Sequence, residues 1–222
     1  MITEDEACRF LSRGLHNLGI NPLPAPRLSQ LWRYFSELKK WNRKMNLVGQ
    51  APDQDLLENH FLDSLALLSE ITAGPLLDVG SGAGFPGLVL KIACPELPVT
   101  LLEPRQKRVS FLRHIIRSLG LTAIEVVEER LVEGDRTFSQ RHGDFPLITC
   151  RALAEIGPFL TLIEAASPPQ GQVFCMKGPR ADEELAAWRL QSPSSPFVLD
   201  RCVRFSLPFS GADRNLVIFK KA

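Results

Sequence analysis

The sequence lacks several features that would assign a class of protein at once. Its 222 residues hold five cysteines, which are scattered and form no C-x-x-C pair. An odd, dispersed set of thiols argues against a disulfide framework and against zinc, and it favours a reducing compartment. No apolar run approaches the length of a membrane span, and the acidic segment 1–6 is unlike a signal peptide. We therefore expect a cytoplasmic protein without a metal or a membrane contact.

An excess of one charge is also lacking. There are 26 lysines and arginines against 25 aspartates and glutamates, so the formal net charge is +1. A global electrostatic argument for nucleic-acid binding therefore fails. The positive charges are nevertheless gathered in two groups: Lys39, Lys40, Arg43 and Lys44, and Arg105, Lys107, Arg108, Arg113 and Arg117. Such groups usually form a solvated helix face, and the alternative is contact with phosphate groups.

The most informative segment that is present is residues 76–87, LLDVGSGAGFPG. An apolar run ends in an acid and opens into four glycines, and a helical pattern follows over 88–93. This order predicts a strand, a tight turn and a helix start, which is where an α/β protein holds a nucleotide-like ligand. Glycines let the chain turn sharply and let a ligand approach without meeting a Cβ. A turn without a ligand is the alternative, but four glycines cost conformational entropy and bring no packing in return.

Two cofactors compete for this loop. Residues 82–87 match the dinucleotide pattern G-x-G-x-x-G. However, Asp78 would repel a pyrophosphate, and Pro86 has no N–H to offer a phosphate. S-adenosylmethionine carries an ammonium and a sulfonium but no phosphate, so it is favoured over NAD. Glu103 ends the next predicted strand, where a carboxylate accepts hydrogen bonds from the ribose of either cofactor.

The patterning on either side of the loop predicts an α/β fold. Residues 3–72 show apolar stripes at helical spacing, and from Gly74 strands alternate with helices. This alternation implies a mostly parallel sheet covered on both faces, and the short final connection implies an antiparallel terminal strand. We predict seven strands, at 75–79, 99–103, 124–127, 145–150, 172–176, 197–205 and 215–221, and helices at 105–119 and 153–166.

Five segments between residues 41 and 178 together resemble one family. Besides the loop with FPG at 85–87, they are WNRKMNL at 41–47, HFLDSL at 60–65, KRVSFL at 107–112 and CRA at 150–152. These are similar to the W-N-x-x-x-N-L, H-[FI]-x-D-S, K-R-x-x-F-L and S-R-A motifs of the bacterial small-subunit (16S) ribosomal RNA guanine-N7 methyltransferases, the glucose-inhibited division protein B family. The resemblance implies a Rossmann-like class I methyltransferase fold over 73–222, with 1–72 as a helical extension packed on it.

The same resemblance implies which residues hold S-adenosylmethionine. They are Gly80, Gly82, Phe85, Glu103, Leu131, Val132 and Arg151. One position departs from the family pattern. The family usually has a carboxylate at the position of Val132, whereas the acid in this chain comes one place later, at Glu133. The other departure is Cys150 in place of the family's serine. The contacts on the adenine side of the cofactor are therefore the least defined.

The chemistry that the resemblance implies needs no general base. N7 of guanine has a lone pair and no proton, so it attacks the methyl group directly and catalysis requires alignment. We assign no catalytic acid or base. Arg151 is the candidate for positioning, and a strand-end salt bridge is its alternative. The candidate RNA contacts are Asn46, His60, Asp63, Ser64, Arg105, Lys107 and Arg108. His60, Asp63 and Ser64 share a helix face and would serve equally to fix the helical extension onto the sheet.

Three alternatives stay open at this point. One is a methyltransferase for another RNA position or for a small molecule. Another is an NAD-binding oxidoreductase, and the third is a non-catalytic RNA-binding module. The expected partner is small-subunit ribosomal RNA or a ribosomal particle, and we expect a monomer. Titration with each cofactor and a methyl-transfer assay separate these alternatives.

Overall fold

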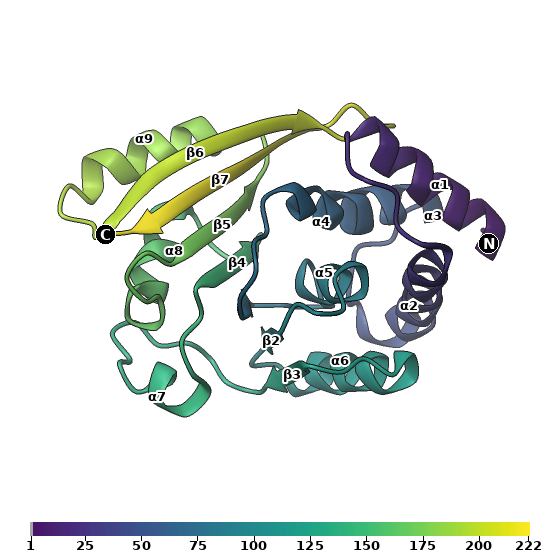
Figure 1. Cartoon of the computed structure of the whole chain (residues 1–222), viewed down its shortest axis with the longest axis horizontal. Helices are drawn as coiled ribbons and strands as arrows, with labels where there is room; N and C mark the ends of the chain where they lie inside the picture. The colour runs from purple at the N-terminus through teal and green to yellow at the C-terminus, as the bar shows by residue number, and fades with distance from the viewer. Residues whose placement is uncertain (1) are drawn as a thin grey trace.

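The computed structural model describes residues 2–222, in which seven strands form one sheet in the order β3-β2-β1-β4-β5-β7-β6 (Figure 1). Strands β1 to β5 are parallel, and β7 runs antiparallel to both β5 and β6. The strands are β1 Leu76–Val79, β2 Val99–Leu102, β3 Ile124–Val127, β4 Leu147–Arg151, β5 Gln172–Lys177, β6 Phe197–Ser206 and β7 Asp213–Lys221. The predicted mostly parallel sheet with an antiparallel terminal strand is confirmed.

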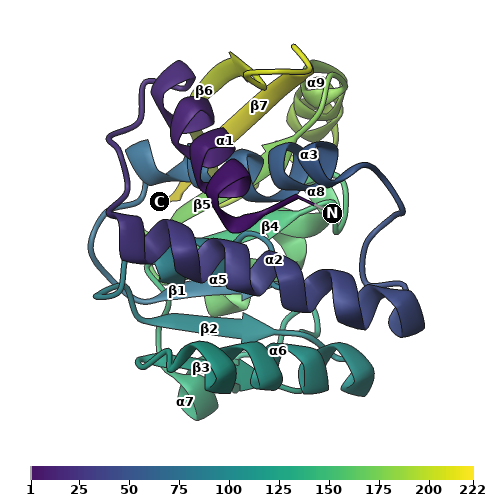
Figure 2. The same cartoon turned by 90° about the vertical axis from the view of Figure 1, so that its right-hand side faces the viewer.

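Helices cover both faces of this sheet. Before β1 come α1 Glu4–Asn17, α2 Ala25–Met45, α3 Asp53–Leu56, the π-helical turn η1 Leu57–Leu62, α4 Asp63–Leu65 and the 3-10 turn η2 Ala66–Ser69. After it come α5 Gly87–Ala93, α6 Gln106–Leu119, α7 Phe138–His142, α8 Ile156–Ile163, the 3-10 turn η3 Glu164–Ala166 and α9 Ala181–Gln191. In Figure 2, α2 passes in front of α5 and lies beside α6, whereas α8 and α9 lie on the other side of the sheet.

Alternation along the strands divides the apolar residues into two cores. In β5, Phe174 faces the core beneath the N-terminal helices, and Val173 and Cys175 face the core beneath α8 and α9. Successive side chains of a strand point to opposite faces, so one apolar run supplies both cores. Leu31 and Phe35 of α2 are buried in the first core, so the aromatic and leucine stripe of this helix is packing surface.

Local signals explain the start of α1 and the end of α6. Thr3 and Glu6 form a capping box that starts α1. Gly120 ends α6 with φ +62°, the left-handed conformation that glycine adopts without strain, as the sequence predicts. Within residues 2–222, no helix combines the length and the apolar character needed to cross a bilayer.

Three predicted details were wrong. The helix predicted at 153–166 begins only at Ile156, because Ala152 takes φ +53° and the chain first forms a loop after β4. Within the region 3–72, where the sequence predicts ordinary helices, the segment that starts at Asp53 becomes the π-helical turn η1 and ends as the 3-10 turn η2. The sequence patterns also miss the five-residue α7 and the weakly amphipathic α9.

Candidate functional site

The glycine loop between β1 and α5 satisfies its own backbone. Gly80, Gly82 and Gly84 have φ of +73°, +60° and +100°, values at which a side chain would strain the chain. The N–H groups of Gly80 and Ser81 both donate to Leu102 O of the neighbouring strand. Those of Gly84 and Phe85 turn back to Ser81 O, at 2.7 and 3.1 Å. The loop is therefore built by hydrogen bonds within the protein.

This construction leaves little for a phosphate to bind. Pro86 has no N–H, the N–H of Gly87 donates to Asp78 Oδ2 at 2.9 Å, and that of Leu88 donates to Gly84 O. Over residues 80–88, only Ala83 keeps an N–H without an acceptor in the described chain. A pyrophosphate at a helix start needs several free N–H groups. The geometry thus argues against NAD and for a ligand without phosphate.

Asp78 lies beneath the loop and is fully buried. Its Oδ2 holds the Gly87 N–H, and its Oδ1 has no hydrogen-bond partner among residues 2–222. Burial raises the pKa of Asp78 to about 7, against the lowering effect of the Gly87 hydrogen bond. A Cβ on Gly87 would lie 2.7 Å from Asp78 Oδ2 and 2.5 Å from Leu101, so only glycine lets α5 start this close to β1.

Glu103 closes the loop from the end of β2. Its Oε2 accepts from the Gly82 N–H and its Oε1 from the Arg105 N–H, both at 2.9 Å, and Arg108 Nη1 lies 3.6 Å from Oε2. Beside this carboxylate, a Cβ on Gly82 would make ordinary contacts, with Arg108 Nη1 at 3.7 Å and Gly80 O at 3.8 Å. A carboxylate at the end of the second strand fits a ligand that carries a ribose.

The N-terminal helices hold the loop from the other side. The Tyr34 hydroxyl of α2 donates to Ala83 O and is fully buried. The ring of Phe85 lies 5.5 Å from Tyr34, 5.2 Å from Phe61 and 5.0 Å from His60 between ring centroids. Phe85 is therefore mostly enclosed by protein. Sequence reasoning missed Tyr34. The one signal for it in the sequence is that the chain has a single tyrosine.

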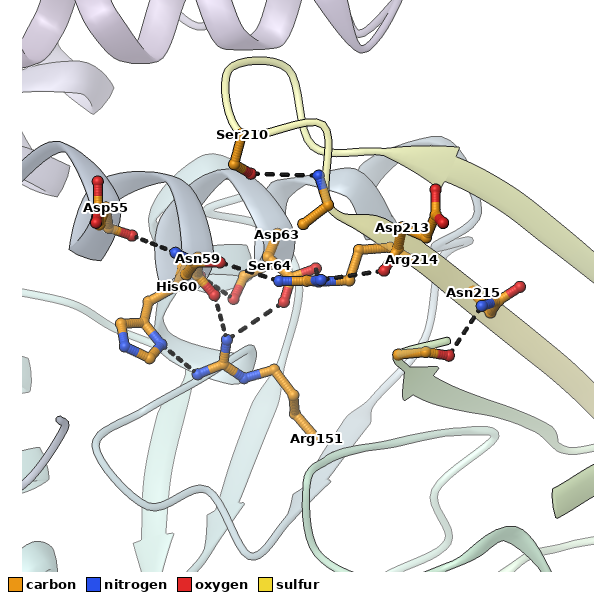
Figure 3. Close-up of polar contacts among 12 residues, drawn as sticks. Asp55, Asn59, His60, Asp63, Ser64, Arg151, Ser210, Asp213, Arg214 and Asn215 are labelled. Atoms are coloured by element: carbon orange, nitrogen blue, oxygen red, sulfur yellow. Dashed lines mark hydrogen bonds and ion pairs between the residues drawn. The ribbon is translucent and has the colours of Figure 1, made fainter. Parts of the chain in front are cut away.

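A cleft of about 630 Å³ opens beside the loop, at the carboxyl ends of β4 and β5. Because β7 is antiparallel, its beginning lies at the same edge of the sheet. Six of the polar side chains that line the cleft are those of Asn59, His60, Asp63, Arg151, Lys177 and Arg214. They come from η1, α4, β4, β5 and β7, so four separate parts of the sequence meet here. Figure 3 shows those from η1, α4, β4 and β7.

Asp63 stands between two arginines in this cleft (Figure 3). Arg151 Nη1 lies 3.4 Å from Asp63 Oδ2 and donates to Asn59 O at 2.7 Å. Arg214 Nε lies 3.2 Å from Asp63 Oδ1, and its Nη2 donates to the side-chain oxygen of Asn59 at 3.0 Å. Burial raises the pKa of Asp63, and both arginines oppose this by favouring the carboxylate. The guanidinium groups are thereby fixed at the rim of the sheet.

His60 is held by Arg151 in one protonation state. Arg151 Nη2 lies 2.7 Å from His60 Nδ1, and a guanidinium is only a donor, so Nδ1 must be the acceptor. The imidazole is therefore neutral and carries its proton on Nε2. Burial, followed by the charges of Arg151 and Arg214, lowers the pKa of His60 to about 3. The ring also stacks on Phe85, at 23° between planes.

The structure brings some of the predicted site residues together and separates others. His60, Asp63 and Arg151 meet, whereas Ser64 is fully buried and donates to His60 O at 2.6 Å. Leu131 packs in the core beneath α8, while Val132 is 59% exposed. The remaining four candidate RNA contacts lie outside the cleft. Asn46 is exposed at the C-terminal end of α2, where the backbone is left-handed, Arg105 and Lys107 are exposed, and Arg108 is half-buried beside Glu103.

Sequence reasoning missed the residues that the last strands contribute. Lys177 ends β5 and pairs with Glu184 of α9 at 2.7 Å, and Arg214 is the second residue of β7. Their only signal in the sequence is their position at the ends of predicted strands. Neither the pairing of Lys177 nor that of Arg214 follows from spacing along the chain.

The fold and the loop define a class of protein. A seven-stranded sheet with an antiparallel β7 between β5 and β6, and a glycine loop after β1, is the class I methyltransferase fold. A solved structure of a SAM-dependent methyltransferase from Aquifex aeolicus shares this fold, with a TM-score of 0.52 and 19% identity, over 83% of this chain and 97% of that one. This similarity concerns the fold alone.

The family follows from sequence comparison. The family model for rRNA small subunit methyltransferase G matches residues 27–215, and the chain belongs to this family. It is 43% identical over 212 residues to the ribosomal RNA small subunit methyltransferase G of Desulfotalea psychrophila, covering 95% of this chain and 96% of that protein. The protein of the same name from Myxococcus xanthus is 40% identical over 213 residues, or 95% of each chain. The resemblance found in the sequence motifs is confirmed.

Proposed function

We propose that this protein transfers a methyl group from S-adenosylmethionine to N7 of a guanine in small-subunit ribosomal RNA. Family membership supports the reaction class and the RNA. The observation in this chain that carries the proposal is the glycine loop: its N–H groups, except that of Ala83, are already used internally, and it lies beside a carboxylate and next to a polar cleft. Such a loop suits a cofactor that has a ribose and no phosphate.

The residues present fit that cofactor. When bound, S-adenosylmethionine supplies a methyl group activated on a sulfonium. We propose that it is held by the seven residues given above, Gly80, Gly82, Phe85, Glu103, Leu131, Val132 and Arg151. The Glu103 carboxylate, which accepts from the Gly82 N–H, is the feature that supports this assignment. The enclosed ring of Phe85 would contribute by shaping the wall of the pocket.

The protein's part in the reaction is to align the acceptor. N7 of guanine needs no deprotonation, so no side chain has to act as a base. Arg151 is fixed by Asn59, His60 and Asp63, and it lies at the end of β4 on the wall of the cleft. We assign Arg151 as a positioning residue that orients His60 and the cleft wall toward the base.

RNA would reach the cleft across exposed basic residues. Within the two basic groups, Lys39 pairs with Asp53, Lys40 with Glu37 and Arg113 with Glu128. The exposed positions left for phosphate contacts are Arg43, Lys44, Arg105, Lys107 and Arg117. We propose a monomer that acts in the cytoplasm on ribosomal RNA or a ribosomal particle. Residues 73–222 would form the methyltransferase domain, and 1–72 the helical extension packed on it.

The test is methyl transfer from radiolabelled S-adenosylmethionine to small ribosomal subunits, and separately to free small-subunit RNA, from cells that lack this activity. Nucleoside analysis is expected to give N7-methylguanosine as the labelled product. The matched control is Gly82→Val, which is expected to bind no cofactor and transfer no label. Label in another nucleoside, or tight binding of NAD without a response to S-adenosylmethionine, would contradict the proposal.

A further inference from the structure

One edge of the His60 ring makes no hydrogen bond to the described residues of the protein. Nδ1 is taken by Arg151 at 2.7 Å, and Phe85 covers one face of the ring. The edge that carries Nε2 faces away from Arg151 (Figure 3), and Nε2 makes no hydrogen bond within residues 2–222. It is also not among the buried side-chain atoms that lack a partner, so it keeps contact with solvent. His60 lines the cleft.

The Arg151 contact decides what this free edge can do. An imidazole can usually present either nitrogen as donor or acceptor, depending on its tautomer. Here the guanidinium requires a lone pair at Nδ1, so the single proton resides on Nε2. Asp63 and Asn59 hold Arg151 in place, at 3.4 and 2.7 Å. The side of His60 that reaches solvent is therefore a hydrogen-bond donor only.

A fixed donor distinguishes the two purines at the edge where methylation occurs. Beside N7, guanine presents the O6 acceptor, whereas adenine presents the N6 amino group, a donor. We propose that His60 selects the target guanine by donating from Nε2–H to O6, with Arg151 and Asp63 as the residues that fix its tautomer. The proposal rests on the function assigned above, and it names the group that recognises the acceptor base at that site.

The neutrality of His60 also suits the charge that the reaction moves. The N7 lone pair forms the new bond to carbon, the carbon–sulfur bond breaks, and its electron pair remains on sulfur. The positive charge passes from sulfur to the purine ring, and no proton leaves. A hydrogen bond from a neutral ring to O6 orients N7 without placing another full charge beside the ring that becomes cationic. An imidazolium at this position would oppose the step.

The first arm of the test uses the unaltered protein and changes only the base. After the methylated nucleotide is mapped, small-subunit RNA is made by ligation with guanosine, inosine or 2,6-diaminopurine riboside at that one position. Inosine keeps O6 and loses the 2-amino group, and diaminopurine replaces O6 by an amino group while keeping N7. We expect inosine to react nearly as well as guanosine, and diaminopurine to react at least about tenfold more slowly. Equal rates for guanosine and diaminopurine would overturn the proposal.

The second arm changes the residue. His60→Asn keeps an oxygen that can accept from Arg151 but has no group at the place of Nε2, whereas His60→Gln can place an amide N–H there. We expect His60→Asn to lose the preference for guanosine over diaminopurine and His60→Gln to regain part of it. His16→Asn, at an exposed position on α1, is the matched control and should leave the preference unchanged.

The two arms separate this proposal from the function on which it rests. If the unaltered protein transfers no label to guanosine RNA, the proposed function fails. If it labels guanosine RNA but His60→Asn keeps the full preference for guanosine, the function stands and the assignment of His60 is wrong. A change in overall rate alone would reflect altered packing on Phe85, so the ratio of kcat/KM for the two bases is the deciding quantity.

Discussion

Replacing Asp78 by asparagine removes the ionisable group beneath the glycine loop and keeps an oxygen for the Gly87 N–H. The buried carboxyl has its pKa raised from 3.8 to about 7, chiefly because burial disfavours the charged form. Between these pH values the folded protein holds a proton that the unfolded chain has released. The free energy of unfolding therefore falls as the pH rises through this window, and it stays level above it.

The magnitude follows from the two pKa values. At about 1.36 kcal/mol for each pH unit, the carboxylate costs the folded state up to about 4 kcal/mol by neutral pH. Asp78→Asn has no such cost, so it should match the unaltered protein near pH 4 and exceed its stability near pH 8. Other shifted groups, such as Asp63 and His60, are present in both proteins and cancel in the comparison.

The assay is urea unfolding of both proteins at several pH values between about 4 and about 8, with S-adenosylmethionine absent. Asp144→Asn, which alters an exposed carboxylate, is the control and should leave the pH profile unchanged. Parallel profiles for Asp78→Asn and the unaltered protein would refute the reasoning. They would mean that Asp78 ionises in the folded state as easily as in water.

The remaining predictions concern the cofactor, the acceptor and the RNA. Gly82→Val should abolish binding of S-adenosylmethionine in calorimetry, because φ is +60° there and a branched side chain would strain the loop; unchanged affinity in a folded variant would make the loop structural only. Arg151→Ala should lower methyl transfer without adding a pH dependence between about pH 6 and 8, and a basic limb in the unaltered protein would indicate a general base. Replacing Arg105 and Lys107 together by alanine should flatten the salt dependence of RNA binding by about one unit of slope for each phosphate group that is no longer neutralised, and an unaltered slope would place both on a solvated face.

Most of the sheet could be predicted because its signals are local. Apolar runs bounded by glycine and proline mark the strands, and Gly120 and the glycine loop mark turns that few other residues can make. The direction of the Asp78 side chain could not be predicted in this way. A strand that is buried on both faces has no polar side to reveal which way Asp78 points, so the burial of its carboxylate beneath the loop does not follow from the pattern.

The contacts in the cleft could be predicted even less from the sequence. The pairing of Asp63 with Arg151 and Arg214 joins residues that lie far apart in the chain, and it depends on β7 being inserted antiparallel next to β5. No periodicity within a short window contains that information. The sequence pattern also does not predict the π-helical turn that carries His60, because its apolar residues fit an ordinary α-helix equally well.

The contacts of Tyr34 and His60 with the glycine loop have a consequence for building hybrid proteins. Both residues precede β1, yet one holds the Ala83 carbonyl and the other covers Phe85. A chimera that took the sheet from one relative and the first 72 residues from another would have to match these contacts and the Asp63 bridge at the same time. Grafting the sheet alone would carry the loop without the side chains that support it. The site therefore depends on the first 72 residues and the sheet together. A hybrid protein should keep a formed site only when both segments come from the same relative.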